Sequence, residues 1–192
     1  MARTGRRPGD ADTRGAILAA ARSAFAEHGY HSATIRGIAG EAGVDPALVH
    51  HYFGTKEDLF GAAISLPLRP AEAAELALAG GMEAVGLNLT RLFFSIWENP
   101  ASRDSLLALL RGAFTTEQAA QSLREFFQSS LMERIADQIQ SSDAGLRVAL
   151  VAAHLVGIAV LRYVVRFEAL RRVSVDELVE AVAPRVQSYL TG

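Results

Sequence analysis

Apolar residues recur at helical spacing along most of the chain, and they divide it into a series of helices. The first helix is expected from about Asp12 or Thr13 to His28, with Gly29 ending it, and its inward stripe is made by Ile17, Leu18, Ala21, Ala24 and Phe25. Further helices are expected at about residues 56–65, 70–79, 82–98, 101–113, 117–140, 143–168 and 174–190. Because no alternating strand pattern is bounded by hairpin turns, the sequence predicts an all-α fold.

The stretch Thr34–Phe53 has the pattern of a helix-turn-helix. Its first helix carries one apolar face, made by Ile35, Ile38, Ala39 and Ala42. Gly43 follows where a C-terminal cap needs a positive φ. Asp45 and Pro46 begin the second helix, Asp45 as the N-cap and Pro46 as the first helical residue. Two short helices joined by such a turn are the geometry that places the second helix in the major groove of DNA.

The second helix of this motif has one inward and one outward face. At about 100° per residue, Val49 and Phe53 share the side that must seal against the first helix. The outward face is made by Ala47, Leu48, His50, His51 and Tyr52. Imidazole and phenol groups can hydrogen-bond phosphates and base edges, and small apolar groups can meet thymine methyl groups. The alternative is that the imidazole and phenol rings only pack a three-helix unit.

Charge is spread unevenly along the 192 residues. Residues 1–56 hold seven Arg and Lys against five Asp and Glu, whereas the remaining chain holds twelve against sixteen. A basic head on an acidic body suits a protein that meets nucleic acid with one end only. The chain has no cysteine, which excludes a disulfide framework, a thiolate metal site and a cysteine nucleophile.

The two segments that flank the motif add basic groups. Residues 1–11 carry Arg3, Arg6 and Arg7 without a following apolar segment, so they are interpreted as a disordered basic arm and not as a signal peptide. Such an arm either lies along DNA or is a solvated tail. After the motif, Thr55 and Asp58 resemble a capping box. Lys56, the only lysine of the sequence, lies between them. Helix termini with a cation bind phosphate, although a lone lysine is usually a solvated surface residue.

Residues 12–60 resemble the N-terminal domain of the tetracycline-repressor (TetR/AcrR) family of one-component transcriptional regulators. The shared pattern runs through Gly29-Tyr30, Thr34-x-x-x-Ile38-Ala39-x-x-Ala42-Gly43-Val44, Val49-His50-His51-Tyr52-Phe53 and Lys56-x-x-Leu59-Phe60. The resemblance implies a helix-turn-helix DNA-binding domain at residues 12–58, with its motif at 34–53. It implies a helical bundle at residues 59–192 for effector binding and dimerisation.

The resemblance also implies which residues contact DNA: Thr34, Arg36, Pro46, Ala47, Leu48, His50, His51, Tyr52 and Lys56. Two departures from the family pattern stand among them. Family members usually have Leu-Tyr where this chain has Val49-His50, so a phosphate contact there would use an imidazole and not a phenol. Where the family often has Ser-x-Gly-Thr, this chain has Asp-Pro-Ala-Leu at residues 45–48, so its base readout is expected to use apolar contacts.

Bulky apolar side chains concentrate in the middle of the body. Aromatic and methionine residues often line ligand pockets between helices, and they are also ordinary core residues. Because the resemblance implies an effector-binding body, a pocket for a small apolar or amphipathic effector is expected among Phe93, Phe94, Trp97, Phe114 and Phe127. The segment Leu59–Leu66 is expected to connect head and body as one stiff helix.

Val148–Leu161 is apolar throughout except for His154. A membrane span needs about 20 apolar residues, and Arg147 and Arg162 bracket this run too closely. A helix that is apolar all round is buried on more than one side, here by the bundle and by a second subunit. The expected dimer interface contains Leu155, Ile158, Arg162, Leu178, Val182 and Val186, and Pro184 is expected to kink the last helix.

An enzyme would need a nucleophile with a base, paired carboxylates or a metal cluster. The five histidines (His28, His31, His50, His51 and His154) have no carboxylate at a ligand-pair spacing, and no glycine-rich phosphate loop follows a strand. The sequence therefore predicts a cytoplasmic, non-enzymatic protein without cofactor or metal. Its partners are double-stranded operator DNA with a palindromic sequence, a second copy of itself and a small-molecule effector that releases it. The alternative is a dimeric DNA-binding regulator with no effector.

Overall fold

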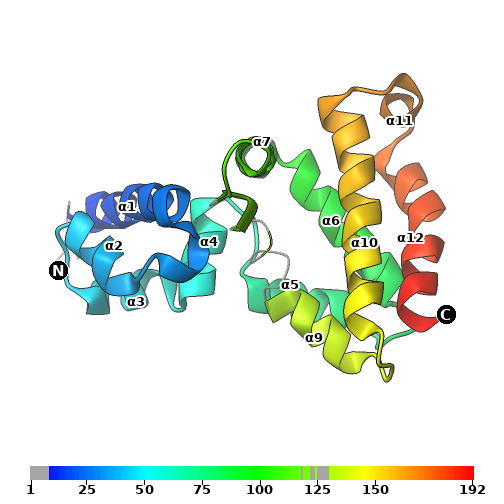
Figure 1. The fold of residues 1–192 in the computed structure, drawn as a ribbon, viewed down its shortest axis with the longest axis horizontal. Helices are drawn as coiled ribbons and strands as arrows, with labels where there is room; N and C mark the ends of the chain where they lie inside the picture. Colours follow the sequence, from blue (N-terminus) through cyan, green and yellow to red (C-terminus); the bar gives the residue numbers. More distant parts are fainter. Residues whose placement is uncertain (1–8, 118, 122–123, 125–129) are drawn as a thin grey trace, which may run out of the picture. The chain divides into compact units, whose positions relative to one another are not determined.

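The computed structural model describes residues 9–117, 119–121, 124 and 130–192, and all regular elements in these ranges are helices (Figure 1). The prediction of an all-α fold is therefore confirmed. The chain divides into two compact units. The first comprises residues 1–66 with 109–126, and the second comprises residues 67–108 with 127–192.

The first unit is built around four helices. They are α1 (Gly9–Ser32), α2 (Ile35–Glu41), α3 (Pro46–Phe53) and α4 (Lys56–Ala63). α1 packs against both α2 and α4, while α2 and α4 contact α3. The largest side chains of their shared core are Ile17, Phe25, Ile38, Val49, Phe53, Leu59 and Phe60. Ile17, Phe25, Ile38, Val49 and Phe53 are inward positions that the helical period predicts.

Local capping sets the ends of the short helices in this unit. The Thr34 hydroxyl accepts a hydrogen bond from the first turn of α2 at 3.0 Å, and an Asp45 carboxylate oxygen does the same for α3 at 2.8 Å. Gly43 has a φ of 68°, as its predicted role requires. Thr55 and Asp58 bond each other's backbone N–H groups at 3.0 and 3.1 Å, which confirms the capping box. Each such N-cap typically stabilises a helix by about 1 kcal/mol.

The ends of α1 and α4 differ from the prediction in two ways. α1 already begins at Gly9, and Gly29, with a φ of 77°, interrupts its regular helical geometry. α4 ends at Ala63, and Ser65 has a φ of 60°. The prediction of one stiff helix from Leu59 to Leu66 is therefore wrong. The division between the units follows Leu66 and not Asp58, because the first turns of α4 bury their apolar side chains in the first core.

The second unit contains most of the remaining helices of the described residues. Its elements are α5 (Pro70–Leu78), α6 (Val85–Glu98), α9 (Ser130–Gln138), α10 (Ala144–Ala159), the π-helix η1 (Val160–Val164), α11 (Glu168–Arg172) and α12 (Val175–Thr191). α7 (Pro100–Ala113) crosses the division between the units. The helix expected at residues 117–140 lies partly outside the described residues. α12 continues through Pro184 to its end.

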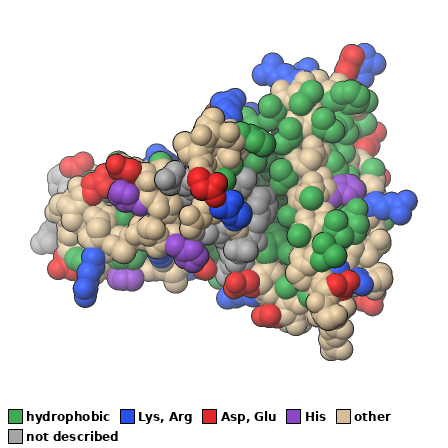
Figure 2. Space-filling view, viewed as in Figure 1, with side chains coloured by type: hydrophobic (Ala, Val, Ile, Leu, Met, Phe, Trp, Pro, Cys, Tyr) green, Lys and Arg blue, Asp and Glu red, His purple; other side chains and the backbone are tan. Residues whose placement is uncertain are grey.

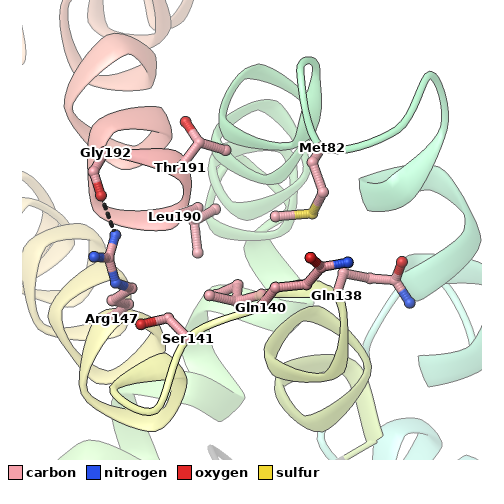
Figure 3. Close-up of a pocket in the computed structure, with 9 residues that line it drawn as sticks. Met82, Gln138, Gln140, Ser141, Arg147, Leu190, Thr191 and Gly192 are labelled. Atoms are coloured by element: carbon pink, nitrogen blue, oxygen red, sulfur yellow. Dashed lines mark hydrogen bonds between the residues drawn. The ribbon is translucent and has the colours of Figure 1, made fainter.

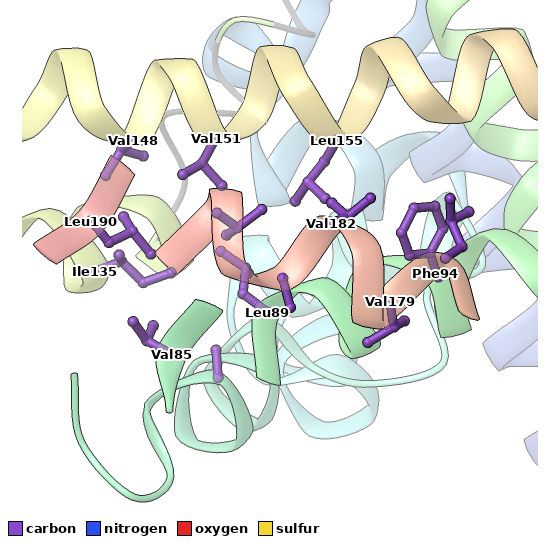
Figure 4. Packing of buried hydrophobic residues seen from close by; sticks show 14 residues of the cluster. Val85, Leu89, Phe94, Ile135, Val148, Val151, Leu155, Val179, Val182 and Leu190 are labelled. Carbon is purple, nitrogen blue, oxygen red and sulfur yellow. The ribbon is translucent and has the colours of Figure 1, made fainter. Parts of the chain in front are cut away.

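α12 is the central helix of the second core. It packs on α6 and on α10 (Figure 4). α5 contacts α6 and α9, and α9 also contacts α10. The buried side chains include Val85, Leu89, Phe94, Ile135, Val151, Leu155, Val182 and Leu190. α6 and α12 approach closely at Gly86, because a Cβ there would lie 2.6 Å from the backbone nitrogen of Gln187. The Gln187 amide accepts from Gly86 N and donates to Met82 O, both at 2.7 Å.

The expected helix at residues 143–168 is interrupted by the π-helix. The Val165 N–H bonds to Val160 O at 2.9 Å, five residues back, and Arg166 then has a φ of 59°. The interruption turns the Arg162 guanidinium inward, where it donates to the carbonyl groups of Leu170 and Val173. Short π segments often interrupt α-helices in this way, and here the turn anchors α11 to the bundle.

Candidate nucleic-acid interface

α3 presents the two faces that its sequence predicts. Val49 and Phe53 are buried in the core of the first unit, whereas Ala47, His50 and His51 are exposed. Leu48 is also exposed among the large apolar side chains, and Pro46 is half-buried at the first position of the helix. An exposed helix face that carries imidazole and small apolar groups matches the donors, acceptors and methyl contacts that a major groove offers.

The position of Tyr52 agrees with both interpretations of its ring, as a packing group and as part of the exposed surface. It is half-buried and packs against the first core, and its ring lies edge-on to His51 with centroids 5.3 Å apart. Part of the Tyr52 side chain therefore supports the helix, as the packing alternative proposed. The neighbouring imidazole is held against this ring at the exposed surface, which limits the positions it can adopt.

His50 is tied to the end of its own helix. Its Nδ1 lies 2.9 Å from the carbonyl oxygen of Gly54, and the Gly54 N–H donates to His50 O, also at 2.9 Å. A φ of 78° at Gly54 turns the carbonyl toward the ring. Because a carbonyl only accepts hydrogen bonds, Nδ1 carries the proton in this contact.

Lys56 makes two contacts within the first unit. Its Nζ donates to the carbonyl oxygen of His31 at 3.0 Å and lies 4.6 Å from the centroid of the Tyr30 ring. The lysine thus connects the start of α4 with the end of α1. The phosphate contact of Lys56 stays a prediction.

Three further residues extend the basic border of this surface. Thr34 caps α2 at the exposed surface, and Arg36 is exposed in the first turn of the same helix. Arg14 was not predicted, and its guanidinium lies 5.0 Å from the ring centroid of Phe53 at the end of α3. The contact joins residues far apart in the sequence. Only the observation that Arg14 is the one basic residue early in the first helix could have drawn attention to it.

Of the five predicted pocket residues, three are brought together in the described part of the chain. Phe93, Phe94 and Trp97 are neighbours, with Phe93 ring centroids 5.4 and 6.0 Å from those of Phe94 and Trp97. Phe94 and Trp97 are buried core residues. Phe114 is 89% exposed and therefore lines no enclosed pocket. Phe127 lies outside the described residues.

A second aromatic contact joins α6 to the π-helix. The rings of Trp97 and Tyr163 stack with centroids 5.4 Å apart and an interplanar angle of 13°. The Tyr163 hydroxyl donates to the Glu98 carboxylate at 2.7 Å, and Arg162 lies 3.5 Å from the same carboxylate. Burial, with a smaller contribution from the bond to Glu98, raises the pKa of Tyr163 to about 12. Sequence reasoning missed this residue because it lies within an apolar run predicted as regular helix.

A cavity of about 370 Å³ opens near the end of α12 (Figure 3). It is lined by Met82, Gln138, Ile139, Gln140, Ser141, Arg147, Leu190, Thr191 and Gly192. Arg147 crosses it to donate to Gly192 O and forms an ion pair with Asp143 at 2.8 Å. The hydrogen bond from Ser141, followed by that from Arg147, lowers the pKa of Asp143. The cavity contains none of the predicted pocket residues and is largely polar.

The predicted interface residues are mostly core residues. Leu155, Leu178, Val182 and Val186 are buried within one chain, because the apolar stripe of α12 packs against α6 and α10. Ile158 packs against the same core, and the Arg162 guanidinium bonds backbone carbonyls as described above. The four buried residues and Arg162 are therefore covered within one chain, and the contact with a second subunit stays a prediction.

Another face of α10 and η1 is apolar and exposed. Leu146, Leu150, Leu161 and Val164 are 61%, 42%, 42% and 47% exposed, and they follow one another at helical spacing. Ala153 and Gly157 are exposed between them. Figure 2 shows hydrophobic side chains gathered along α10. We call these six residues the exposed α10 face.

Residues 144–164 are long and apolar enough to cross a membrane by composition alone, with a mean hydropathy of 2.1. One such helix is weak evidence, since helices in protein cores and interfaces have the same composition. Its inner side packs in the core, and both bracketing arginines bond backbone carbonyls of the second unit. These contacts favour a helix covered by protein. In the described part of the chain, His, Asp and Glu side chains form no group of three or more that could hold a metal ion.

Comparison with known proteins identifies the family. Residues 17–63 match the model for bacterial regulatory proteins of the tetR family, and residues 83–190 match the tetracyclin repressor-like C-terminal domain. The chain is 31% identical to the HTH-type transcriptional regulator BetI of Agrobacterium fabrum, over 87% of this chain and 84% of that protein.

Solved structures agree with this result. A TetR-family regulator from Streptomyces coelicolor is 37% identical and aligns with a TM-score of 0.53 over 98% of this chain and 99% of that one. NalD of Pseudomonas aeruginosa, described as the secondary repressor of a multidrug efflux pump, is 20% identical over 95% of this chain and 98% of its own, with a TM-score of 0.51, which supports the fold alone. This chain is a non-enzymatic, helix-turn-helix transcriptional regulator that belongs to the TetR family.

Proposed function

We propose that the protein is a cytoplasmic homodimeric repressor that binds a palindromic operator through α3 and is released by a small apolar or amphipathic effector. The observation that carries the proposal is the exposed face of α3. Its core side is fixed by Val49 and Phe53, and its two ends are fixed by Asp45 and Gly54. A recognition element needs this combination of a rigid support and an exposed surface with hydrogen-bonding groups.

The proposed DNA contacts fall into two groups. Base edges are met by the outward residues of α3, namely Pro46, Ala47, Leu48, His51 and Tyr52. Phosphates are met by the border of the surface, namely Thr34, Arg36, His50 and Lys56, to which we add Arg14. The first group would determine operator preference, and the second would supply affinity for any duplex.

For the dimer, we propose that the exposed α10 face packs against the same face of a second copy. Large exposed apolar patches mark interaction sites, and a two-fold interface brings one patch against itself. Ala153 and Gly157 are small enough to let two helices approach closely between the flanking leucines. A second DNA-binding unit held by this contact would make the preferred operator palindromic.

For the effector, we propose a site near Phe93, Trp97 and Tyr163, where rings from α6 and η1 come together. Aromatic groups with a few polar partners are typical of small-molecule sites. The alternative is a dimeric regulator without an effector. Thermal-shift screening with apolar and cationic small molecules separates the two, since a bound ligand stabilises the folded state. A protein stabilised by none of these compounds favours the alternative.

Selection of bound sequences from a random duplex library tests the DNA-binding proposal. The selected sequences should converge on one motif whose two halves are related by inversion. The matched control is Ala47→Glu, which places a carboxylate on the exposed face of α3 without disturbing the core. The variant should keep its helical content and enrich no motif, because its charge faces the phosphates. Failure of the original protein to enrich any sequence would overturn the proposal.

A further inference from the structure

The hydrogen bond between His50 and Gly54 fixes how the imidazole can meet DNA. Nδ1 donates to the Gly54 carbonyl at 2.9 Å, so in the neutral ring the other nitrogen, Nε2, carries a lone pair. His50 lies on the exposed side of α3, where this nitrogen is the part of the ring available to a ligand. Phosphate oxygens are also acceptors, so the neutral ring cannot donate to a phosphate while it keeps the bond to Gly54.

We infer that His50 keeps its bond to Gly54 and contacts a DNA phosphate as an imidazolium, so that DNA binding takes up a proton at this residue. The inference rests on the proposed function, since it needs α3 to meet DNA. A protonated ring keeps the bond to Gly54 and gains an Nε2–H that donates to the phosphate. A tyrosine, which the family usually carries here, could donate without any change of charge. The imidazole therefore makes this contact dependent on pH.

The surroundings of His50 include groups of both signs. The Asp58 carboxylate lies beside Gly54, with Oδ2 3.1 Å from the position a Cβ would take there, and it accepts two hydrogen bonds from Thr55. Other titratable or charged groups nearby are His51 and Tyr52 on α3, Asp45 at its N-cap, Lys56 and Glu57 on α4, Arg36 and Glu41 on α2, and Arg14 of α1 beside Phe53. The acidic and basic groups around His50 roughly balance. The phosphate is therefore the main charge that the His50 ring gains as a neighbour when DNA binds.

The direction of the pH effect follows from proton linkage. Phosphate binding favours the protonated ring, so the affinity for DNA should rise as pH falls through the range of about 5 to 8 in which histidines titrate. A full proton taken up by each protomer corresponds to about a tenfold change in affinity per pH unit for that protomer. The effect should be present with any duplex, because a phosphate contact carries no sequence information.

The test compares three proteins on two duplexes. One duplex has the sequence recovered by selection, and the other has a scrambled sequence of the same composition. Affinity is measured by fluorescence anisotropy at about pH 6 and about pH 8. Proton uptake is measured by calorimetry in two buffers with different ionisation enthalpies. The proteins are the original chain, His50→Gln, and His28→Gln as a control on the exposed surface of α1. Glutamine offers an uncharged N–H donor that does not titrate in this range.

The original protein and His28→Gln should bind more tightly at the lower pH and take up protons, and His50→Gln should lose both effects. Nitrogen NMR of the His50 ring should show protonated Nδ1 alone in the free protein and both nitrogens protonated on DNA. Equal affinity at both pH values, or an unchanged pH effect in His50→Gln, would overturn the inference while the DNA-binding proposal stands. Such results would point to a bridging water or to a base amino group that donates to Nε2. Failure to bind either duplex at any pH would overturn both.

Discussion

At the scale of single residues, the exposed groups of the first unit are held by contacts to the backbone. His50 bonds the Gly54 carbonyl, Lys56 bonds the His31 carbonyl, and Asp45 bonds the first turn of α3. Each contact lowers the number of side-chain conformations before DNA arrives. Binding then costs less conformational entropy, which typically amounts to about 0.5–1.5 kcal/mol for each side chain that is immobilised.

Lys56 is the first residue for which this organisation gives a prediction. Lys56→Met keeps an unbranched apolar stem beside the Tyr30 ring and removes the charge. Affinity for operator and scrambled duplexes should fall by the same factor, and the slope of log affinity against log salt should flatten by about one unit for each protomer. Anisotropy titrations over a salt series measure both quantities. An unchanged slope with an unchanged affinity would remove Lys56 from the phosphate contacts.

Tyr163 gives a prediction for alkaline pH. Its pKa is raised to about 12 by burial and by the Glu98 carboxylate, so the folded state keeps its phenol neutral above the usual range of about 10. The contribution of the Tyr163 phenol to the free energy of unfolding is fully present below about pH 10 and is lost as pH rises toward about 12. The reason is that the phenol ionises at a lower pH in the unfolded chain than in the folded one. Tyr163→Phe should show a weaker loss of stability in urea unfolding over this range. The same alkaline loss in both proteins would contradict the assignment.

Residue-level features were predictable from sequence where they depend on near neighbours. The caps at Thr34 and Asp45, the turn at Gly43 and the capping box of Thr55 with Asp58 each need only a few consecutive residues. The contact between Lys56 and His31 joins residues 25 positions apart and depends on how α1 and α4 pack. Sequence periodicity contains no information about such a pairing, so the second role of Lys56 was not predicted.

At the scale of elements, α10 shows that an apolar run does not reveal which of its side chains lie in the core and which lie on an exposed face. Periodicity correctly predicted a helix with more than one apolar side, and the structure assigns Val151 and Leu155 to the core and Leu146 and Leu150 to the exposed face. Leucine has the same character in a core and in an interface, so composition could not distinguish them. The stripe of α12 was assigned to the interface for the same reason, although α6 of the same chain covers it.

Two leucines on α10 provide a matched pair of variants. Leu150→Glu places a charge on the exposed α10 face, so the protein should fold, lose dimerisation and lose affinity for a palindromic duplex. Leu155→Glu buries an unpaired charge in the core and should destabilise the fold itself by several kcal/mol, or about 3–5 by analogy with broken buried ion pairs. Analytical ultracentrifugation and urea unfolding distinguish the outcomes. A Leu150→Glu protein that remains dimeric would exclude this face as the interface.

At the scale of the whole molecule, the proposed DNA contact and the proposed self-association belong to different units of the chain. The first unit carries α3, and the second carries the exposed α10 face. A two-fold contact through the second unit would duplicate the first, and operator affinity would then depend on both. An effector that binds near Trp97 and Tyr163 would act on the second unit only. Its coupling to DNA must then be reciprocal, with operator DNA weakening the effector by the factor by which the effector weakens DNA.

Hydroxyl-radical footprinting on the selected duplex tests the central claim most directly. Two recognition helices of one dimer should protect two patches on one side of the duplex, about 34–36 Å apart and related by the symmetry of the sequence. The Leu150→Glu monomer should protect neither patch at the protein concentration that suffices for the original dimer. A single protected patch, or two patches that persist unchanged in a monomeric variant, would contradict an account in which two copies of α3 act together.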